Sequence, residues 1–291
     1  DVLIKPGISD IPLTRADINI TPNGYIPIIV ANMVTSGTFE VARIASKRKI
    51  LTFLSKEYTI DEYLTNLMDI DIKYVGITSG VRQRDIEKTL KVINLYPDLG
   101  YINVDIANVG ANVQGMIGAI KLYKKHYSGK IVAGNVATVD LAVMLEKAGA
   151  DIIKIGIGSG AACLTRTEVG VGVPQLSAVM EISKAVSCPV ISDGGCVTSG
   201  DVCKAIAAGA SFVMLGGMFS ACKELAKPGD DFVEFYGLGS KKMYETFNPS
   251  DKEYRPVEGR TLKIPIDKSI NDVFKQLEGA LRSVCTYVGV D

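Results

Sequence analysis

Residues 147–158 read KAGADIIKIGIG, and residues 207–218 read AAGASFVMLGGM. Each segment runs from the end of a helix through a tight turn into an apolar strand that finishes in glycine. The two segments lie about 60 residues apart, which is the length of two strand–helix units of about 30 residues each. The repeat therefore predicts a chain built from strands and helices in alternation.

Short apolar runs rich in β-branched residues recur along the whole chain at 26–33, 50–55, 73–79, 101–108, 130–136, 151–158, 189–195 and 212–217. Most are continuously apolar rather than alternating, as expected for strands that are covered on both faces. Helix-length segments lie between them; Thr138 and Gly149 are placed to begin and end one of these. We predict an α/β fold, a single (β/α)8 TIM barrel over residues 1–291, in preference to a doubly wound open sheet.

The alternation of predicted strands and helices ends after the eighth apolar run. Residues 218–265 carry many Pro, Gly and charged residues, which predicts a long mobile loop or flap that is ordered in part at best. A last helix is expected after it, capped by Asp267 or Ser269. Its apolar face is predicted to consist of Ile270, Val273, Phe274, Leu277 and Leu281.

The composition excludes several classes of protein. Lysine plus arginine and aspartate plus glutamate each number 32 in 291 residues, so a dedicated nucleic-acid or membrane-surface binder is not expected. No apolar run reaches the length of a membrane span. Six cysteines without close pairing and a single histidine argue against a disulfide framework and a histidine-based metal site. We expect reduced thiols and a cytoplasmic or similarly reducing location.

In such a barrel the site lies at the carboxyl ends of the strands. Cys163 follows a glycine-rich turn there and is a candidate nucleophile, although cysteine is also a common inert core residue. The pairs Gly194–Gly195 and Gly216–Gly217 suit backbone binding of phosphate, or tight turns alone. Asp193 suits a ribose diol or a helix cap. No dinucleotide fingerprint GxGxxG opens a strand–helix unit. The residues thus predict a phosphate-binding barrel enzyme without naming its reaction.

Several stretches together resemble the IMP dehydrogenase/GMP reductase superfamily, and its GMP reductase members in particular. The most specific are IKIGIGSGAACLTRTEVGVGVPQLSAV (153–179), ISDGGC (191–196), FVMLGGMFS (212–220) and EYRPVEGRT (253–261). Others are IPIIVANM (26–33), DIAN (105–108), AGNVAT (133–138), FYG (235–237) and LRSVCTYVG (281–289). They occur in family order over nearly the whole chain.

The resemblance implies the NADPH-dependent reductive deamination of GMP to IMP, with release of ammonia. It implies that Cys163 adds to C2 of the purine and forms a covalent thioimidate that hydride then reduces. Thr165 and Glu258 would carry protons, and Lys56 would assist deamination. It further implies a homotetramer in purine salvage.

The resemblance also implies which residues bind each ligand. The substrate-binding residues would be Asp193, Gly194, Gly195, Gly216, Gly217, Leu238, Gly239, Ser240, Arg255, Pro256, Val257 and Gly259. The NADPH-binding residues would be Lys56, Asp105, Ile106, Ala107, Ile157, Gly158, Gly239, Tyr254 and Arg255, completed, across a subunit boundary, by Thr14, Arg15, Ser283, Val284, Cys285 and Thr286. A potassium ion would lie on carbonyls near Gly158, Gly160, Cys163 and Arg166.

Three departures from the family pattern keep alternatives open. Ala161 replaces a serine that contacts phosphate, Val34 replaces a carboxylate, and Glu57 replaces a histidine beside Lys56. They leave room for a nucleotide-binding homologue that has lost turnover. IMP dehydrogenase is the nearest rival activity. It usually carries a regulatory domain pair where only 56–72 stands here, and an Arg-Tyr pair that 218–265 lacks.

Overall fold

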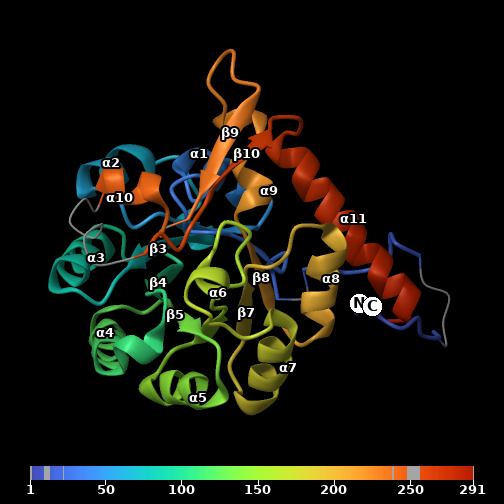
Figure 1. Cartoon of the computed structure of the whole chain (residues 1–291), viewed down its shortest axis with the longest axis horizontal. Helices are drawn as coiled ribbons and strands as arrows, with labels where there is room; N and C mark the ends of the chain where they lie inside the picture. Colours follow the sequence, from blue (N-terminus) through green and yellow to red (C-terminus); the bar gives the residue numbers. More distant parts are fainter. Residues whose placement is uncertain (1, 10–13, 22, 238, 248–255, 291) are drawn as a thin grey trace.

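Eight parallel strands close into a barrel in the order β1 to β8, as the sequence predicted (Figure 1). The computed structural model describes residues 2–9, 14–21, 23–237, 239–247 and 256–290. Pairing of β1 with β8 closes the barrel, with Ile28 opposite Val213 and Val30 opposite Leu215. The strands are β1 (Ile28–Val30), β2 (Leu51–Leu54), β3 (Val75–Ser79), β4 (Tyr101–Asp105), β5 (Lys130–Val136), β6 (Ile152–Ile155), β7 (Val190–Asp193) and β8 (Phe212–Leu215).

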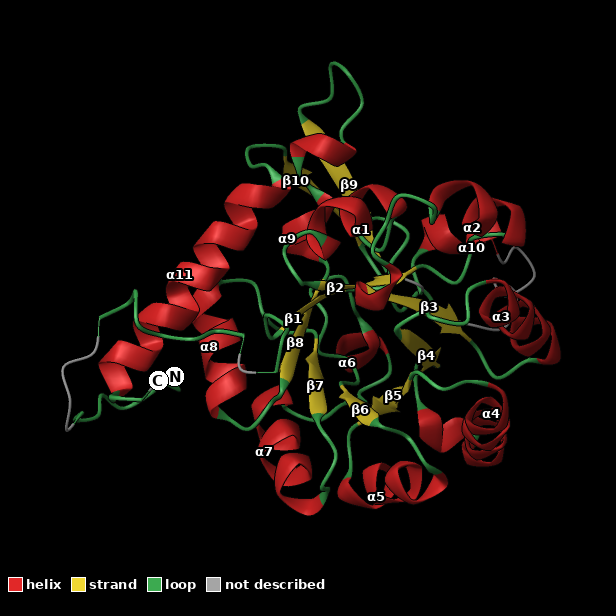
Figure 2. Ribbon diagram, turned by 180° about the vertical axis from the view of Figure 1, so that it is seen from behind, coloured by secondary structure: helices red, strands yellow, loops and turns green. Residues whose placement is uncertain are grey.

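Helices surround the barrel on its outer side (Figure 2). The longer ones between strands are α1 (Phe39–Ser46), α2 (Ile60–Asn66), α3 (Gln83–Leu95), α4 (Val113–His126), α5 (Val139–Ala148), α7 (Gln175–Ala185) and α8 (Ser199–Ala207). Short helical turns are α6 (Thr165–Glu168), α9 (Gly217–Ser220), η1 (Ile72–Tyr74), η2 (Val109–Ala111) and η3 (Lys223–Leu225).

The ends of α5 lie where the sequence predicted them. Thr138 occupies the N-cap position, although its side chain makes no capping hydrogen bond. Gly149 ends the helix with φ 105°, a left-handed conformation that glycine adopts without strain. The order of turn, strand and glycine exit that follows repeats after α8, and this repetition makes the barrel readable from the sequence.

The strands are apolar throughout because both of their faces are covered. Inside the barrel, Phe53, Tyr101, Ile191 and Met214 belong to one buried cluster that fills the space between the strands. Outside, two larger clusters join the strands to the helices. All four residues of β2 are buried, which explains why the run shows no alternation.

The segment after β8 is more ordered than the sequence indicated. Strands β9 (Phe232–Tyr236) and β10 (Thr261–Pro265) pair antiparallel and rise beyond the barrel as a two-stranded ribbon (Figure 1). Helix α10 (Lys241–Phe247) lies between them in the chain, and residues 248–255 lie outside the described part. Phe235 is 4% exposed and anchors the two-stranded ribbon next to Gly216 and Gly217.

The last helix, α11 (Ile270–Val288), confirms the predicted apolar face, since all five residues named for it are buried. Ser269, rather than Asp267, caps it, in a reciprocal arrangement with Asp272. The helix packs along α8 on the outside of the barrel (Figure 1). No helix in the described part of the chain has both the length and the apolar character that crossing a membrane requires.

Replacement by alanine is expected to change the free energy of unfolding in opposite directions at two glycine positions. A Cβ on Gly76 in β3 would lie 2.3 Å from Cδ1 of the buried Phe53 ring, so Gly76→Ala should lower the free energy of unfolding by about 1–3 kcal/mol. A Cβ on Gly118 in α4 would have no other atom within 4 Å, so Gly118→Ala should raise it by about 0.5–1 kcal/mol. Urea denaturation of both variants measures the two signs; equal effects would contradict the tight packing at Gly76.

Candidate active site

The loop after β6, residues 156–164 and here called the Cys163 loop, turns sharply at its glycines. Gly156 and Gly158 have φ 153° and 74°. A Cβ on Gly156 would lie 2.2 Å from the Asp193 carbonyl oxygen, so only glycine fits this approach. The Cys163 N–H donates to the Gly160 carbonyl at 2.9 Å, and the thiol is half-buried.

A second segment, residues 256–260 and here called the flap segment, docks on the Cys163 loop through backbone hydrogen bonds. The Leu164 N–H donates to the Glu258 carbonyl at 2.7 Å, and the Arg260 N–H donates to the Ala162 carbonyl at 2.9 Å. Gly259 forms bridges with Cys163 and with Ser240. The sequence placed these parts in one site, and the structure brings them into contact.

Three of the predicted catalytic side chains form a continuous hydrogen-bonded chain. The Cys163 thiol donates to the Thr165 hydroxyl with an Sγ–Oγ1 distance of 3.2 Å. The Thr165 hydroxyl donates to Oε2 of Glu258 at 2.7 Å. A hydroxyl that accepts from a thiol and donates to a carboxylate can pass a proton from one to the other.

Lys56, the fourth predicted catalytic residue, lies in the loop after β2. Its backbone carbonyl accepts a hydrogen bond from Nζ of Lys88 on α3, which also donates to the Tyr58 carbonyl at 3.0 Å. Burial lowers the pKa of Lys88 and outweighs the opposing charge of Asp85. The Lys56 charge helps to lower the pKa of Asp105, so this lysine is near Asp105 at the carboxyl ends of the strands, here called the barrel mouth.

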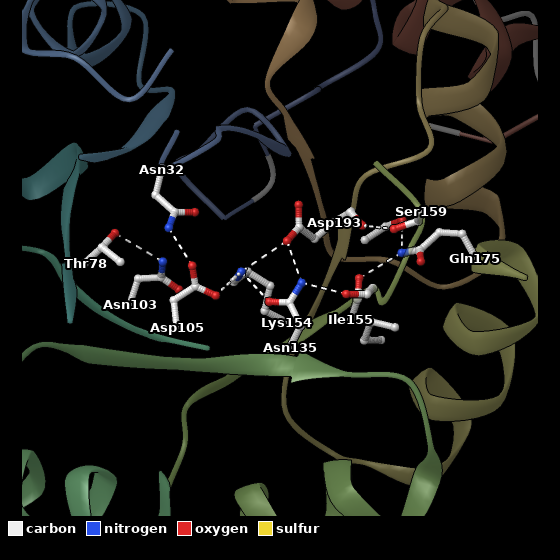
Figure 3. A network of polar contacts seen from close by, with 12 residues as sticks. Asn32, Thr78, Asn103, Asp105, Asn135, Lys154, Ile155, Ser159, Gln175 and Asp193 are labelled. Atoms are coloured by element: carbon white, nitrogen blue, oxygen red, sulfur yellow. Dashed lines mark hydrogen bonds and ion pairs between the residues drawn. The ribbon is translucent and has the colours of Figure 1, made fainter. Parts of the chain in front are cut away.

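Asp105 and Asp193 are joined by a lysine that no sequence motif singled out (Figure 3). Nζ of Lys154 lies 2.8 Å from Oδ1 of Asp105 and 3.1 Å from Oδ2 of Asp193. Asn32 donates to the other oxygen of Asp105 at 2.7 Å, and Asn135 donates to Oδ2 of Asp193 at 2.8 Å. A lysine inside the apolar run of β6 was the available signal, because a buried lysine needs carboxylate partners.

The pKa values of Asp105 and Lys154 are both shifted towards the ionised form. Burial opposes ionisation of Asp105, but the charge and hydrogen bond of Lys154, with smaller contributions from Asn32 and Lys56, lower its pKa overall. Burial likewise opposes the charge on Lys154, and the two carboxylates outweigh it, so its pKa is raised.

The two glycine pairs lie at the ends of neighbouring strands. Gly194 and Gly195 have φ 83° and 86°, and a Cβ on Gly194 would lie 2.9 Å from the Gly160 nitrogen. The glycine turn after β7 therefore abuts the Cys163 loop. The Ser159 hydroxyl donates to the Asp193 carbonyl at 2.7 Å, so it does not replace the hydroxyl missing at Ala161.

The other predicted ligand-binding residues fall into three groups. Gly239, Ser240, Pro256, Val257 and Gly259 belong to the flap segment or to the turn it pairs with, while Ile106, Ala107 and Ile157 follow β4 and β6. Leu238, Tyr254 and Arg255 lie outside the described residues.

The third group lies apart from the barrel mouth. Arg15 donates to the Ser283 hydroxyl at 2.8 Å, which brings Thr14 and Arg15 to the segment 283–286. This segment is near the far end of α11, on the outer side of α8 in both views (Figures 1 and 2). Within one chain, the structure does not bring this group to Cys163 or Asp105.

The predicted potassium ligands fit only in part. The Gly160 carbonyl already accepts the Cys163 N–H. The Arg166 guanidinium donates to the Val173 carbonyl at 2.5 Å, and its stem packs against Gly158. Among the described residues, no cluster of His, Cys, Asp or Glu could hold a metal ion.

Gly259 offers a test of how the flap segment is held. A Cβ there would lie 2.7 Å from the Ser240 nitrogen, so Gly259→Ala should weaken docking by about 1–3 kcal/mol. Alkylation of Cys163 by iodoacetamide, followed by mass spectrometry, should then accelerate by about tenfold. Burial raises the pKa of Cys188 and Cys222 to about 12, so these thiols contribute little background.

Gly237→Ala is the matched control, because a Cβ there would only reach ordinary contact with Ala162 at 3.9 Å. Its alkylation rate should equal that of the unchanged chain. Equal rates for all three proteins would show that Gly259 does not hold the flap segment in place.

Comparison with known proteins agrees with this geometry. A family model described as IMP dehydrogenase / GMP reductase domain matches residues 1–291. A GMP reductase of Onchocerca volvulus is 38% identical over 313 residues, which cover 99% of this chain and 85% of that protein. A GMP reductase of Escherichia coli O139:H28 is 37% identical over 310 residues, which cover 99% of this chain and 89% of that protein. The chain belongs to the IMP dehydrogenase/GMP reductase family.

Proposed function

We propose that this chain catalyses the NADPH-dependent reductive deamination of GMP to IMP, with release of ammonia. The single observation that carries the proposal is the contact chain from the Cys163 thiol through Thr165 to Glu258. It lies beside glycine turns suited to phosphate. A nucleophile, a proton relay and an anion site are what deamination of a purine nucleotide through a covalent intermediate requires.

Deamination begins with attack of the Cys163 sulfur on C2 of GMP. The thiol proton passes to the Thr165 hydroxyl, whose own proton passes to the Glu258 carboxylate 2.7 Å away. Glu258 returns a proton through Thr165 to the 2-amino group, which leaves as ammonia once it is protonated. The carbon–nitrogen bond breaks, and a thioimidate between Cys163 and the purine remains.

Reduction of the thioimidate completes the reaction. NADPH, when bound, supplies the hydride that C2 accepts. The carbon–sulfur bond then breaks, the sulfur leaves as thiolate, and IMP is released. The flap segment lies directly on the Cys163 loop, so it is placed to keep water from the thioimidate, which hydrolysis would divert.

The binding of GMP is proposed to use the ends of β7 and β8. Asp193 would accept hydrogen bonds from the ribose hydroxyls, and the amides of Gly194, Gly195, Gly216 and Gly217 would hold the phosphate. The turn around Ser240 and the flap segment would border the base.

The binding of NADPH is proposed to use Asp105, Ile106 and Ala107 with Ile157 and Gly158. These residues fit a nicotinamide ribose, because the Asp105 carboxylate is held ionised at the mouth and a carboxylate accepts the hydrogen bonds of a diol. Lys56 would lie beside both ligands and assist departure of the amino group.

Further parts of the proposal concern assembly and environment. We propose one catalytic domain over residues 1–291, in a homotetramer where Thr14, Arg15 and the segment 283–286 complete a neighbouring chain's cofactor site. We propose a cytoplasmic or other reducing location, which suits six cysteines that form no disulfide. A potassium ion on the carbonyls of the Cys163 loop stays part of the proposal, and no chemical step depends on it.

The direct test follows the absorbance of NADPH with GMP as substrate. We expect consumption of one NADPH for each ammonia released. A parallel reaction with IMP and NAD⁺ tests the dehydrogenase activity, which we expect to be absent. Reduction of NAD⁺ by IMP in place of GMP-dependent NADPH oxidation would contradict the proposal, and binding of both ligands without turnover would identify an inactive homologue.

Cys163→Ala should reduce turnover by at least about a thousandfold, because the covalent route is lost. GMP affinity should change by less than about threefold, since no predicted binding group is removed. Calorimetry measures the affinity and the NADPH assay measures turnover. Near-normal turnover by this variant would rule out the thioimidate.

Thr165→Val should lower kcat by about 100- to 10,000-fold, because the thiol and the Glu258 carboxylate lose the hydroxyl between them. Thr167→Val on the same short helix is the control. Its hydroxyl donates to the Leu164 carbonyl at 2.9 Å instead of joining the relay, so kcat should stay within about threefold. Similar losses in the two variants would show that disturbance of α6, not the relay, is responsible.

A further inference from the structure

Lys154 is a buried cation between the two proposed ligand sites. Its side chain is 2% exposed, while those of Asp105 and Asp193 are 12% and 22% exposed. Nζ contacts both carboxylates and also the side-chain oxygen of Asn135 (Figure 3). The start of the lysine stem is fixed by close packing, because a Cβ on Gly134 would lie 2.7 Å from Cβ of Lys154.

The three charged groups come from three different strands. Asp105 ends β4, Lys154 lies in β6 and Asp193 ends β7. Lys56, from the loop after β2, is the other charged group that acts on Asp105. Asn32 and Asn135, which orient the carboxylates, are neutral. Two partly buried carboxylates therefore share one close ammonium group.

Two carboxylates this close to each other cannot both stay ionised easily without that ammonium group. Like charges in a partly buried site disfavour the second ionisation, and such a pair takes up and releases protons as a unit. In the proposed function, each carboxylate must accept hydrogen bonds from a different ribose. A carboxyl group that keeps its proton is a poor acceptor for a diol.

We propose that Lys154 is a positioning residue that keeps Asp105 and Asp193 ionised together, so that substrate ribose and cofactor ribose can be held at the same time. The proposal rests on the proposed function, because that function assigns one ligand to each carboxylate. It adds a role for a residue that contacts neither ligand: the lysine couples the two sites through their shared charge.

Lys154→Met tests this role by removing the charge while retaining a side chain of similar length. The unreactive pair GMP and NADP⁺ is suitable, because no hydride is available and binding can be measured at equilibrium. Calorimetry gives the affinity for NADP⁺ with and without GMP. In the unchanged chain, GMP should alter that affinity by a factor that does not depend on pH.

In the variant the two ligands should become antagonists. The carboxylate pair would hold one proton at neutral pH, so each ligand would compete for the single ionised group. GMP should then weaken NADP⁺ binding by about tenfold at neutral pH. At high pH the pair loses its remaining proton and both carboxylates become ionised. The antagonism between the ligands should therefore weaken towards about pH 9 and strengthen towards about pH 6. A purely structural defect would weaken binding without this pH dependence.

Two further variants control the experiment. Lys154→Met combined with Asp105→Asn removes one of the competing carboxylates, so GMP and NADP⁺ should no longer antagonise each other in a pH-dependent way. Should the single variant fail to fold, recovery of a folded chain in this double variant would support the proposal, because it removes the uncompensated charge. Lys124→Met removes a lysine that pairs with Asp151 at 2.6 Å outside the barrel mouth, and should behave like the unchanged chain.

The outcomes separate this inference from the proposed function. An unchanged chain that binds neither GMP nor NADP⁺ would overturn the proposed function, and this inference with it. Normal binding and turnover by the unchanged chain, with the same pH-independent coupling in Lys154→Met, would overturn the role of Lys154 alone. So would a pH-dependent antagonism that persists in the double variant, or loss of folding in both variants.

Discussion

The backbone pairing of β1 with β8 is the constraint on which the rest of the structure depends. It joins Ile28 near the start of the chain to Val213 near the end of the repeat, and so turns a row of strands into a closed ring. Closure forces the carboxyl ends of all eight strands to one mouth. At this mouth Lys154 of β6 contacts Asp105, which ends β4, and Asp193, which ends β7.

The contact between the flap segment and the Cys163 loop is mainly a matter of backbone. Leu164 and Arg260 each donate an amide N–H across it, and Gly259 lies where a side chain would not fit. The side chain of Glu258 is thus delivered to Thr165 by main-chain pairing rather than by its own charge. Main-chain pairing therefore holds together the hydrogen-bonded chain from Cys163 through Thr165 to Glu258.

Much of the fold followed from local signals in the sequence. Continuous apolar runs identified the strands, and Gly149 and the apolar face of α11 marked helix ends and packing. Cys163 was singled out by its glycine-rich turn, and Thr165 and Glu258 by motif resemblance. The last two are 93 residues apart, and only the tertiary structure shows their contact.

Other features depend on contacts that no local pattern records. Lys154 was missed because a lysine inside the apolar run of β6 calls for carboxylate partners without identifying them, and Asp105 and Asp193 lie 49 and 39 residues away in the chain. The order after β8 was underestimated because glycine, proline and charge suggest a loop, whereas Phe235 and the pairing of β9 with β10 supply the anchor. The hydroxyl missing at Ala161 is not replaced by Ser159, because the Ser159 hydroxyl donates to the Asp193 carbonyl.

The base of the two-stranded ribbon formed by β9 and β10 packs directly on the glycine turn after β8. A Cβ on Gly216 would lie 3.4 Å from the Phe235 ring and 2.8 Å from the Met33 sulfur, and Gly217 faces the same ring. Side chains at positions 216 and 235 would therefore share one small volume, and a larger side chain at either position would clash with the other. A bulkier residue in the turn therefore demands a smaller one in the strand.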